Sequence, residues 1–347
     1  MAILAERTPS SPPVIAPVVC QGRRPVWSVM VPCYNCLTYL RDALEAVLAQ
    51  DPGPELMQIM VVDDCSTDGD VRALVQAIGN NRVGYFRHDE NRGSLRNFET
   101  CLNLSTGHWV HILHGDDRVV PGFYTEVESL FQRFPEAGAA FTNVAYWQSD
   151  LNKLHESRAL FDEPGIFKDF LIANAQRLQL QPPSIVVKRA VYEQLGGFYA
   201  VHYGEDWEMW TRIGAHFPVA YSPKSLAHYR YQTANGISHQ AIRRGENVHD
   251  IIKVIDIMHG YLPVAEREQV KRTARREYAL YCVSLARLLY RTNPKAAMLQ
   301  VRGALELSDD LRVYYALLKN MVEEVSFRTW IRKLYRQAKE VLQTVTA

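Results

Sequence analysis

Polar side chains follow short apolar runs at three places in the N-terminal third of the chain. These side chains are Asn35, Asp64, Asp116 and Asp117. Carboxylate and amide oxygens are ligands that Mg²⁺ and Mn²⁺ prefer in proteins. A single Asp behind a strand is commonly a turn residue or a helix cap. Several strands that deliver such groups to one edge of a sheet instead indicate a metal or ligand site.

The spacing of apolar residues predicts strands and helices that alternate with short links. The predicted strands are Val26–Val31, Ile59–Val62, Val83–Phe86, Trp109–Leu113, Ala139–Tyr146 and Ile185–Val187, and the predicted helices are 38–50, 70–78, 95–104, 123–134 and 205–216. This alternation is typical of an α/β fold with a mainly parallel sheet covered by helices. Ligands of such sheets bind beyond the carboxyl ends of the strands, where the four polar side chains are expected.

Composition and charge narrow the classes of function. The chain has 347 residues, of which 47% are hydrophobic, and a net charge of +1. A duplex nucleic-acid binder usually carries a basic excess or a basic stripe, so nucleic acid is not an expected partner. No apolar run reaches the roughly 20 residues of a membrane-spanning helix, and the N-terminus lacks the apolar core of a signal peptide. We therefore expect a cytoplasmic protein.

The six cysteines show no spacing typical of a disulfide framework, which fits a chain with free thiols. Cys33 and Cys36 form a CxxC pair, but a zinc site needs further ligands that the sequence does not offer nearby. A thioredoxin-like redox role is the alternative to two small residues at the end of a strand. We favour the simpler interpretation.

Changes in composition divide the chain into three parts. Residues 1–24 are rich in proline and lack periodicity, so we expect a flexible arm. Residues 25–243 carry the alternating elements, with a first half over 25–120 and a second half over 121–243. Residues 244–347 show long helical patterns with no strand signal and are predicted to be a helical extension.

Five segments together resemble the family 2 glycosyltransferases, in the order and spacing of that family. They are SVMVPCYN at 28–35, VVDDCSTDG at 61–69, NRG at 91–93, LHGDDRVVPG at 113–122 and GEDWEMWTRI at 204–213. The resemblance covers about residues 26–240. It implies the GT-A fold and an inverting transfer of a sugar from a nucleotide diphosphate-sugar to a hydroxyl acceptor, with Mn²⁺ or Mg²⁺ as cofactor.

The resemblance also implies roles for residues on the donor side. Asp117 matches the residue that contacts the metal, and Asp116 matches one that serves the donor ribose or a metal-bound water. Asp64 matches the carboxylate that accepts the imide N–H of a pyrimidine base. Tyr34 matches an aromatic residue that lies against the base, although a core tyrosine is the alternative.

Further donor-side residues follow from the same match. Pro32 ends a strand and would place its carbonyl near the base, and Asn35 follows in the same motif. Asn91 and Gly93 belong to the donor-side NRG segment, where glycine permits close approach of the backbone. Arg96 is either a phosphate ligand or a solvated helix residue.

On the acceptor side, the GED motif supplies the candidate general base. Asp206 matches the family residue that takes the acceptor proton, and Glu205 would bind the acceptor or support the base. Trp207 and Trp210 follow at helical spacing. We expect these two indoles to pack the core first, with sugar stacking as the second interpretation.

One departure from the family concerns a histidine that follows this motif. Gln232 stands where relatives often carry a His that assists the metal or the diphosphate, so His228 or a water would have to replace it. Tyr229-Arg230 and Ser238 keep the pattern of a flexible loop that closes over the diphosphate.

Three further histidines, His108, His111 and His114, suggest a metal cluster. On a strand, alternate side chains point to opposite faces, so the three cannot act together. Only His114 is expected near the metal motif.

The sequence lacks the motifs that other nucleotide-dependent enzymes would carry. A nucleotidyltransferase would carry a glycine-rich basic loop after the first strand, and dehydrogenases and P-loop enzymes have glycine motifs that do not occur here. A catalytically inactive carbohydrate-binding or nucleotide-binding relative remains as the alternative outside enzymes. UDP or dTDP sugars are the favoured donors, and a saccharide or lipid-linked saccharide is the favoured acceptor.

The C-terminal tail carries an apolar stripe at helical spacing, flanked by basic side chains. The stripe consists of Phe327, Ile331, Leu334, Ala338, Val341 and Val345. Such a helix either packs on its own domain or on a dimer partner, which we favour, or lies peripherally on the inner face of an anionic membrane.

Overall fold

The computed structural model describes residues 7–19, 22–148, 153–231 and 236–320. A ten-stranded sheet forms its centre, with the order β3-β2-β1-β4-β9-β6-β10-β5 and with β7 beside β6 and β8 beside β10. The strands are β1 (Trp27–Cys33), β2 (Met57–Asp63), β3 (Gly84–Arg87), β4 (Trp109–Ile112), β5 (Arg118–Val119), β6 (Ala139–Gln148), β7 (Lys153–Glu156), β8 (Gly165–Ile166), β9 (Ile185–Lys188) and β10 (Val219–Arg230).

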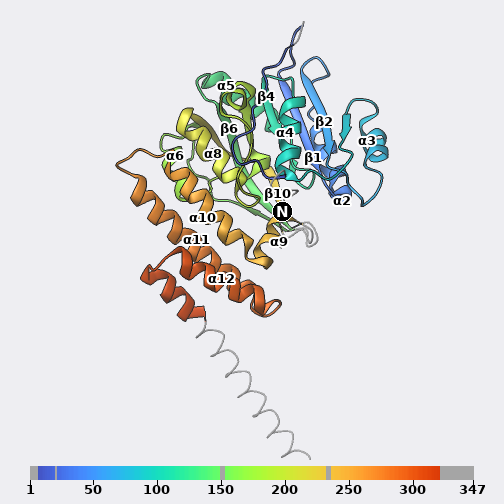
Figure 1. Cartoon of the computed structure of the whole chain (residues 1–347). Coiled ribbons are helices and arrows are strands. Elements are labelled where there is room, and N and C mark those ends of the chain that lie inside the picture. The colour runs from blue at the N-terminus through green and yellow to red at the C-terminus, as the bar shows by residue number, and fades with distance from the viewer. Residues whose placement is uncertain (1–6, 20–21, 149–152, 232–235, 321–347) are drawn as a thin grey trace, which may run out of the picture.

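Helices cover both faces of this sheet and continue beyond it (Figure 1). They are α2 (Leu37–Leu48), α3 (Val71–Gly79), α4 (Ser94–Leu104), α5 (Phe123–Arg133), α6 (Phe170–Gln176), α7 (Arg189–Leu195), α8 (Glu205–His216), α9 (Ile237–Arg244), α10 (Glu246–His259), α11 (Arg267–Leu289) and α12 (Pro294–Leu307). The fold is therefore a mixed α/β sheet flanked by helices with a C-terminal helical region, as the sequence predicts.

The strands that precede the polar side chains are parallel and adjacent. β1 lies between β2 and β4 and pairs in parallel with both. β3 extends this parallel part beyond β2, whereas β9 is antiparallel to β4 and to β6. The carboxyl ends of β1, β2 and β4 consequently meet at one edge of the sheet, and the segments after these strands lie side by side.

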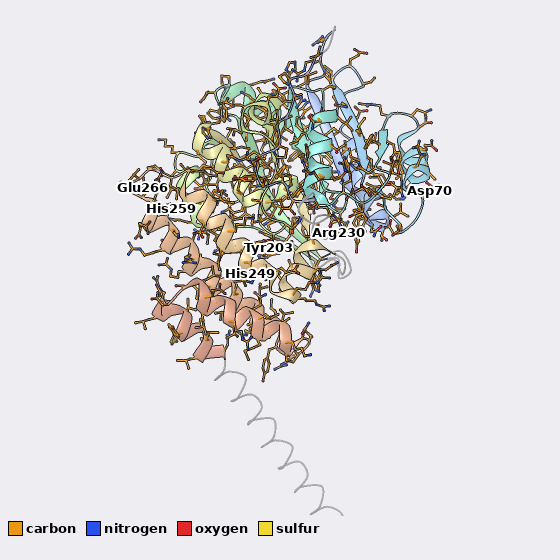
Figure 2. All side chains as sticks on the ribbon, in the orientation of Figure 1. Asp70, Tyr203, Arg230, His249, His259 and Glu266 are labelled. Carbon is orange, nitrogen blue, oxygen red and sulfur yellow. The ribbon has the colours of Figure 1, made fainter. Side chains whose placement is uncertain are left out.

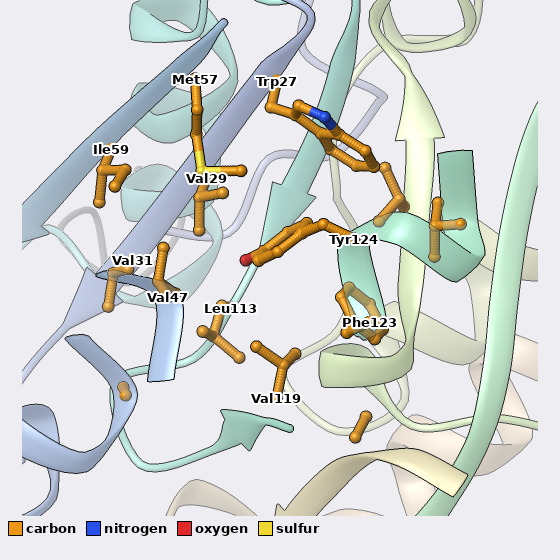
Figure 3. Packing of buried hydrophobic residues seen from close by; sticks show 14 of the residues in the cluster. Trp27, Val29, Val31, Val47, Met57, Ile59, Leu113, Val119, Phe123 and Tyr124 are labelled. Carbon is orange, nitrogen blue, oxygen red and sulfur yellow. The ribbon is translucent and has the colours of Figure 1, made fainter. Parts of the chain in front are cut away.

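Alternation along the strands separates two apolar cores. Val29 and Val31 pack with α2, α3 and α5 on one face, and Met30 packs with α4 and α8 on the other. Figure 3 shows the first core, where Trp27 meets Tyr124 edge-on at a ring distance of 5.1 Å. Because the strands are buried on both faces, they read as continuous apolar runs in the sequence.

The C-terminal helices pack against α6 and the start of α8. Trp207 of α8 shares an apolar cluster with Val254 of α10, Val283 of α11 and Ala304 of α12. Figure 1 shows these helices stacked beyond the α8 side of the sheet. The boundary that we placed near residue 244 falls between α9 and α10. Among the described residues, no helix combines the length and apolarity needed to cross a bilayer.

The described part of the N-terminal arm differs from our expectation of a flexible segment. The carbonyls of Pro9 and Pro13 accept hydrogen bonds from the backbone N–H groups of Ala200 and Gly197, at 2.9 and 2.8 Å. Ile15 is fully buried in the core beside α4. Proline-rich sequence lacks periodicity but can still lie extended along a surface, because proline favours an extended backbone without internal hydrogen bonds, whose carbonyls can accept from a neighbouring segment.

Candidate active site

The metal motif lies on a tight turn after β4. The N–H of Gly115 donates to the carbonyl of Pro32 at 3.1 Å, which brings the turn over the end of β1. A Cβ at position 115 would lie 2.7 Å from the Cys36 sulfur and 3.3 Å from the Pro32 oxygen. A larger residue at this position would displace the Cys36 side chain, so glycine favours the close approach that sets Asp116 and Asp117 at the carboxyl edge of the sheet.

Three side chains at this turn can hold a metal ion. Ligand atoms of His114, Asp116 and Asp117 all lie within 4.8 Å of one another. Asp117 is buried, and its Oδ1 accepts the backbone N–H of Arg230 at 2.8 Å. Its Oδ2 is also buried and has no hydrogen-bond partner among the described residues. An unpaired buried carboxylate oxygen is costly, so this arrangement fits a bound cation.

The electrostatics of the cluster agree with that fit. Burial, and then the adjacent Asp116 charge, raise the pKa of Asp117 well above its usual value. Burial lowers the pKa of His114, whose ring stacks on Phe98 at 5.2 Å. A cation would offset the repulsion between the two carboxylates, and a neutral imidazole has a nitrogen lone pair to offer.

Arg230 holds the metal motif in place. Its Nε donates to the Asp116 carbonyl at 2.7 Å, and its guanidinium donates to the Asp42 carboxylate at 2.8 Å. The guanidinium also lies over the Trp147 ring at 3.8 Å. We expected this residue in a flexible loop, but it is the buried last residue of β10. The sequence does not predict strand β10 because Pro223 and Lys224 interrupt its apolar pattern.

The other histidines lie away from the cluster. His111 is fully buried, and its Nε2 contacts the Pro183 carbonyl at 3.0 Å. His108 is exposed directly before β4. His228 accepts a hydrogen bond from Arg118 at 3.1 Å, so it does not compensate at the metal motif. Gln232 lies outside the described residues.

Asp64 lies at the end of β2 and organises the turn that carries the NRG segment. Its carboxylate accepts hydrogen bonds from the Asn91 amide at 2.9 Å, the Arg92 N–H at 2.7 Å and the Gly93 N–H at 2.8 Å. Burial nevertheless raises its pKa. A carboxylate has about four lone-pair sites, so three contacts leave room for one more. Gly93 has φ +88°, a conformation that favours glycine.

Asp63 is the neighbouring carboxylate and has a structural role. Its Oδ1 accepts the Ser66 N–H at 2.9 Å, and its Oδ2 accepts the Tyr85 hydroxyl at 2.7 Å. Arg87 also pairs with Oδ2. Burial opposes ionisation, but the hydrogen bonds from Ser66, Tyr85 and Arg87 outweigh it and lower the pKa of Asp63.

The other predicted donor-side residues take different positions. Tyr34 is 51% exposed, so it presents its ring at this edge and is not a core tyrosine. The Asn35 side chain accepts the Thr67 N–H at 2.7 Å and shapes the neighbouring loop. Arg96 pairs with Glu99 along α4 at 2.7 Å. The carbonyl of Pro32 accepts the hydrogen bond from the Gly115 N–H described above.

The candidate base lies at the start of α8. Gly204 precedes the helix with φ +86°, and Glu205 and Asp206 occupy its first turn. Both line a pocket with His114 and Trp210, which brings the acceptor-side motif next to the metal motif. Burial raises the pKa of Asp206 to about 6. Burial and the Asp206 charge raise the pKa of Glu205 well above its usual value.

The two tryptophans of α8 are core residues. Trp207 and Trp210 are 2% and 3% exposed, which agrees with our first expectation. The Trp207 indole donates to the Asn174 carbonyl at 2.5 Å. Neither ring offers a face to solvent, although Trp210 forms part of the pocket wall. The two residues therefore position Asp206 by anchoring its helix.

Comparisons with known sequences match the chain to a family of enzymes. The model of glycosyl transferase family 2 matches residues 28–196. An uncharacterised protein of Mycobacterium tuberculosis is 28% identical over 225 residues, 61% of this chain and 69% of that protein. The putative teichuronic acid biosynthesis glycosyltransferase TuaG of Bacillus subtilis is 32% identical over 125 residues, 35% of this chain. The chain spans 47% of the length of TuaG.

Two solved structures share the fold. Staphylococcus aureus TarS, residues 1–349, in complex with UDP-GlcNAc, superposes with a TM-score of 0.61 at 15% identity, over 87% of this chain and 91% of that chain. The mannosyltransferase PcManGT of Pyrobaculum calidifontis, in complex with GDP-Man and Mn²⁺, gives a TM-score of 0.51 at 21% identity, over 92% of this chain and 91% of that chain. These likenesses establish the GT-A architecture.

Proposed function

Because the chain belongs to glycosyl transferase family 2, we propose that it transfers a sugar from a nucleotide diphosphate-sugar to a hydroxyl of a saccharide or lipid-linked saccharide. The observation that carries this proposal is the buried Asp117, one of whose oxygens has no partner in the described part of the chain, beside the pocket that Asp206 and His114 line. A relative named for teichuronic acid biosynthesis supports a place in the synthesis of a polysaccharide or glycoconjugate.

Asp117, Asp116 and His114 would hold the cation. A divalent cation supplies charge neutralisation at the diphosphate that leaves. An imidazole in the set favours a transition metal over Mg²⁺, which prefers oxygen ligands, so we favour Mn²⁺. Arg230 keeps the turn rigid through the Asp117 carboxylate and the Asp116 carbonyl. Fixed ligands bind the cation without reorganisation.

Asp206 is the proposed general base. In a single inverting displacement the acceptor attacks the face opposite the leaving diphosphate, so the base must stand apart from the metal ligands. Asp206 lies on α8 and shares a pocket wall with His114. A pKa of about 6 leaves it ionised at neutral pH and still basic enough to take a proton late in the attack. Glu205 beside it would bind the acceptor.

The donor edge supports a base-stacking role for Tyr34. Its exposed ring can lie against a nucleobase, a contact worth roughly 1–3 kcal/mol. The Asp64 carboxylate holds the Asn91–Gly93 turn and keeps one spare acceptor site. That site suits the imide N–H of uracil or thymine. TarS in complex with UDP-GlcNAc favours UDP, and PcManGT in complex with GDP-Man keeps a GDP sugar as the alternative.

We place the described chain in the cytoplasm and treat residues 25–243 as the catalytic domain, with a helical extension after 244. The apolar stripe at 327–345 lies outside the described residues. We favour its packing on this domain or on a second copy over contact with a membrane. Flotation with anionic vesicles tests this choice. Full-length protein and a version ending at Ser326 should both stay unbound. If the full-length protein floats with the vesicles and the shortened version does not, the tail contacts the membrane.

Nucleotide binding provides the direct test of the proposed function. UDP, dTDP, GDP and CMP are added singly with and without Mn²⁺, and the melting temperature is measured. One nucleotide should raise it only with Mn²⁺, by mass action on the native state. Chelation with EDTA should abolish this shift and the transfer activity, and Mn²⁺ should restore both. Full activity in chelator contradicts the metal-dependent mechanism.

A further inference from the structure

The described part of the N-terminal arm, residues 7–19, runs from the core toward the donor side of the proposed active site. Ile15 is fully buried in the core, and the Arg189 guanidinium donates to the Ala16 carbonyl at 2.9 Å. The two backbone hydrogen bonds to the segment 197–200 described above continue this path. The arm is therefore fixed to the domain along its length, and its first described residues have a defined place.

That place is at the carboxyl edge of the sheet. The Thr8 hydroxyl lies 2.6 Å from His202 Nε2, in the segment that directly precedes the GED motif of α8. Figure 2 shows the next residue, Tyr203, at the same edge of the sheet as Arg230, which holds the metal motif. The hydrogen bond of Thr8 thus sets the preceding residue, Arg7, at the edge where the donor is expected.

The side chain of Arg7 lies across the turn that Asp64 holds. Its Nε is 3.2 Å from the position that a Cβ of residue 93 would occupy, and one terminal nitrogen is 3.7 Å from the same position. The N–H of Gly93 donates to the Asp64 carboxylate at 2.8 Å. Because Gly93 has no side chain, the guanidinium of Arg7 can lie against the backbone that binds Asp64.

The guanidinium of Arg7 is open to a ligand. Arg7 is half-buried, and its side chain makes no hydrogen bond or ion pair with any residue that the structure describes. Burial raises the pKa of Asp64, and the nearby charge of Arg7 is among the influences that lower it. A guanidinium has five N–H donors. A cation with unused donors therefore lies near a carboxylate that keeps a spare acceptor site.

The position of Arg7 favours the nucleobase over the diphosphate. Strand β1 separates β2, which ends beside Asp64, from β4, which leads to the metal motif. Neighbouring strands lie about 4.8 Å apart, so the ends of β2 and β4 are roughly 10 Å from each other. A diphosphate held by a cation at Asp117 lies at the β4 end. The part of the donor that reaches the β2 end is the base.

We propose that Arg7 binds the base of the donor nucleotide together with Asp64, so that the N-terminal arm completes the donor site. This inference rests on the proposed function. The imide N–H of uracil or thymine stands between two carbonyl groups. When Asp64 accepts that N–H, Arg7 donates to the neighbouring carbonyl. Hydrogen bonds from a charged donor are stronger than those between neutral groups.

The pairing of a carboxylate with a guanidinium selects between bases. Cytosine has an unprotonated ring nitrogen in place of the imide N–H, and an amino group in place of one carbonyl. It would leave the Asp64 carboxylate facing a lone pair, and buried polar groups without partners are costly. Arg7 lies outside residues 28–196, the part that matches the family model. The arm therefore adds this selection to the shared donor site.

Isothermal titration calorimetry of full-length protein tests the contact, with UDP, dTDP, CDP and GDP added singly in the presence of Mn²⁺. The wild type should bind UDP or dTDP most tightly. Arg7→Ala should weaken that binding about tenfold or more, because hydrogen bonds from a charged group are lost, and the preference over CDP should shrink. Arg7→Lys keeps the charge and should weaken binding less. Affinity for pyrophosphate with Mn²⁺ should not change, since pyrophosphate has no base.

Arg23→Ala is the matched control. It removes the same charge from an exposed residue shortly before β1, at the opposite edge of the sheet, and should bind UDP like the wild type. Equal UDP and dTDP affinities of wild type and Arg7→Ala overturn the proposal. So does an equal loss of pyrophosphate affinity, which would place Arg7 at the diphosphate, and so does a wild type that prefers CDP or GDP. A wild type that binds none of the four nucleotides counts against the glycosyltransferase function itself.

Discussion

The carboxylate of Asp63 at the end of β2 has different surroundings from those of Asp117 in the metal motif and Asp206 in α8. Asp63 accepts hydrogen bonds from Ser66, Tyr85 and Arg87, and these hold its pKa down. Asp117 keeps one buried oxygen without a partner among the described residues, and the Asp206 carboxylate accepts backbone N–H groups from Trp207 and from its own residue. Burial raises the pKa of both.

This difference separates carboxylates that shape the fold from those that are available to react. Several hydrogen-bond donors from the loop at 64–67 and from strand β3 surround the Asp63 carboxylate. Few hydrogen-bond donors surround the carboxylates on the turn after β4 and at the start of α8. Burying a charge without donors is unfavourable for stability, and such an arrangement is expected where a cation, a substrate or a proton completes it. The variants below test this separation.

Asp117→Asn should have the largest effect. The amide keeps an oxygen for the Arg230 N–H but removes the charge that a cation needs. Loss of metal charge stabilisation at the leaving diphosphate should lower kcat/KM by on the order of 10⁴-fold. The melting temperature without metal should not fall, while the Mn²⁺-dependent shift with nucleotide should disappear. Retention of that shift would remove Asp117 from the metal site.

Asp206→Asn should reduce turnover by about 10³-fold, as expected for loss of a positioned general base. The side chain keeps its size, and its oxygen can still accept the Trp207 N–H. Nucleotide binding with Mn²⁺ should therefore remain at the wild-type level, which distinguishes this variant from Asp117→Asn. Near-normal turnover would assign the proton to Glu205 or to a substrate group, and product with a retained anomeric configuration would contradict the single displacement.

The pH dependence gives a smaller effect that is specific to the base. A raised pKa of about 6 means that Asp206 loses its basic form below that pH. The kcat/KM should fall about tenfold per unit of pH below 6, and Asp206→Asn should lack this limb. The same raised pKa makes the stability of the fold depend on pH. The folded state binds the Asp206 proton more tightly than the unfolded state, so protonation contributes stability at low pH, and this contribution is lost as pH rises through about 6.

Most of the donor half could be predicted from the sequence because its signals are local. Periodicity marked β1, β2, β4 and the helices between them within a few residues. The rule that parallel strands end at one edge then placed Asp64 and Asp117 near each other. The CxxC pair was also predictable: the Cys33 and Cys36 sulfurs lie 3.4 Å apart as free thiols at the end of β1.

The contacts that separate the two kinds of carboxylate are long-range, so the sequence did not show them. Arg230 meets the metal motif more than a hundred residues away in the chain, from a strand whose Pro223 and Lys224 hid it. Tyr281 reaches Tyr203 from α11 through packing that no motif encodes. The burial of Ile15 is another case, because a proline-rich segment carries no periodicity to show what it packs against.

Asp63→Asn should have the smallest effect on catalysis and a clear effect on stability. The amide cannot pair with Arg87 as an ion, and its NH₂ group would face the Ser66 N–H or the Tyr85 hydroxyl. Loss of hydrogen bonds to a buried charge should lower the unfolding free energy by about 2–3 kcal/mol. Urea denaturation measures this difference, and kcat/KM of the folded variant should stay within about twofold of the wild type, since the Asp63 side chain bonds to loop and β3 residues away from the metal motif.

The pH dependence of that stability loss makes the comparison with Asp206 complete. A lowered pKa contributes stability above the unfolded value of about 3.9, and this contribution is lost only as pH falls through the folded value. The gap between wild type and Asp63→Asn should therefore stay constant above about pH 5. The Asp206→Asn variant should instead gain stability relative to the wild type as pH rises from about 4 to about 6 and level off above that, because the wild type loses the protonated form of Asp206 over this interval. If both variants show the same pH trend in urea denaturation, the two carboxylates are not held differently, and the separation between structural and reactive acids fails.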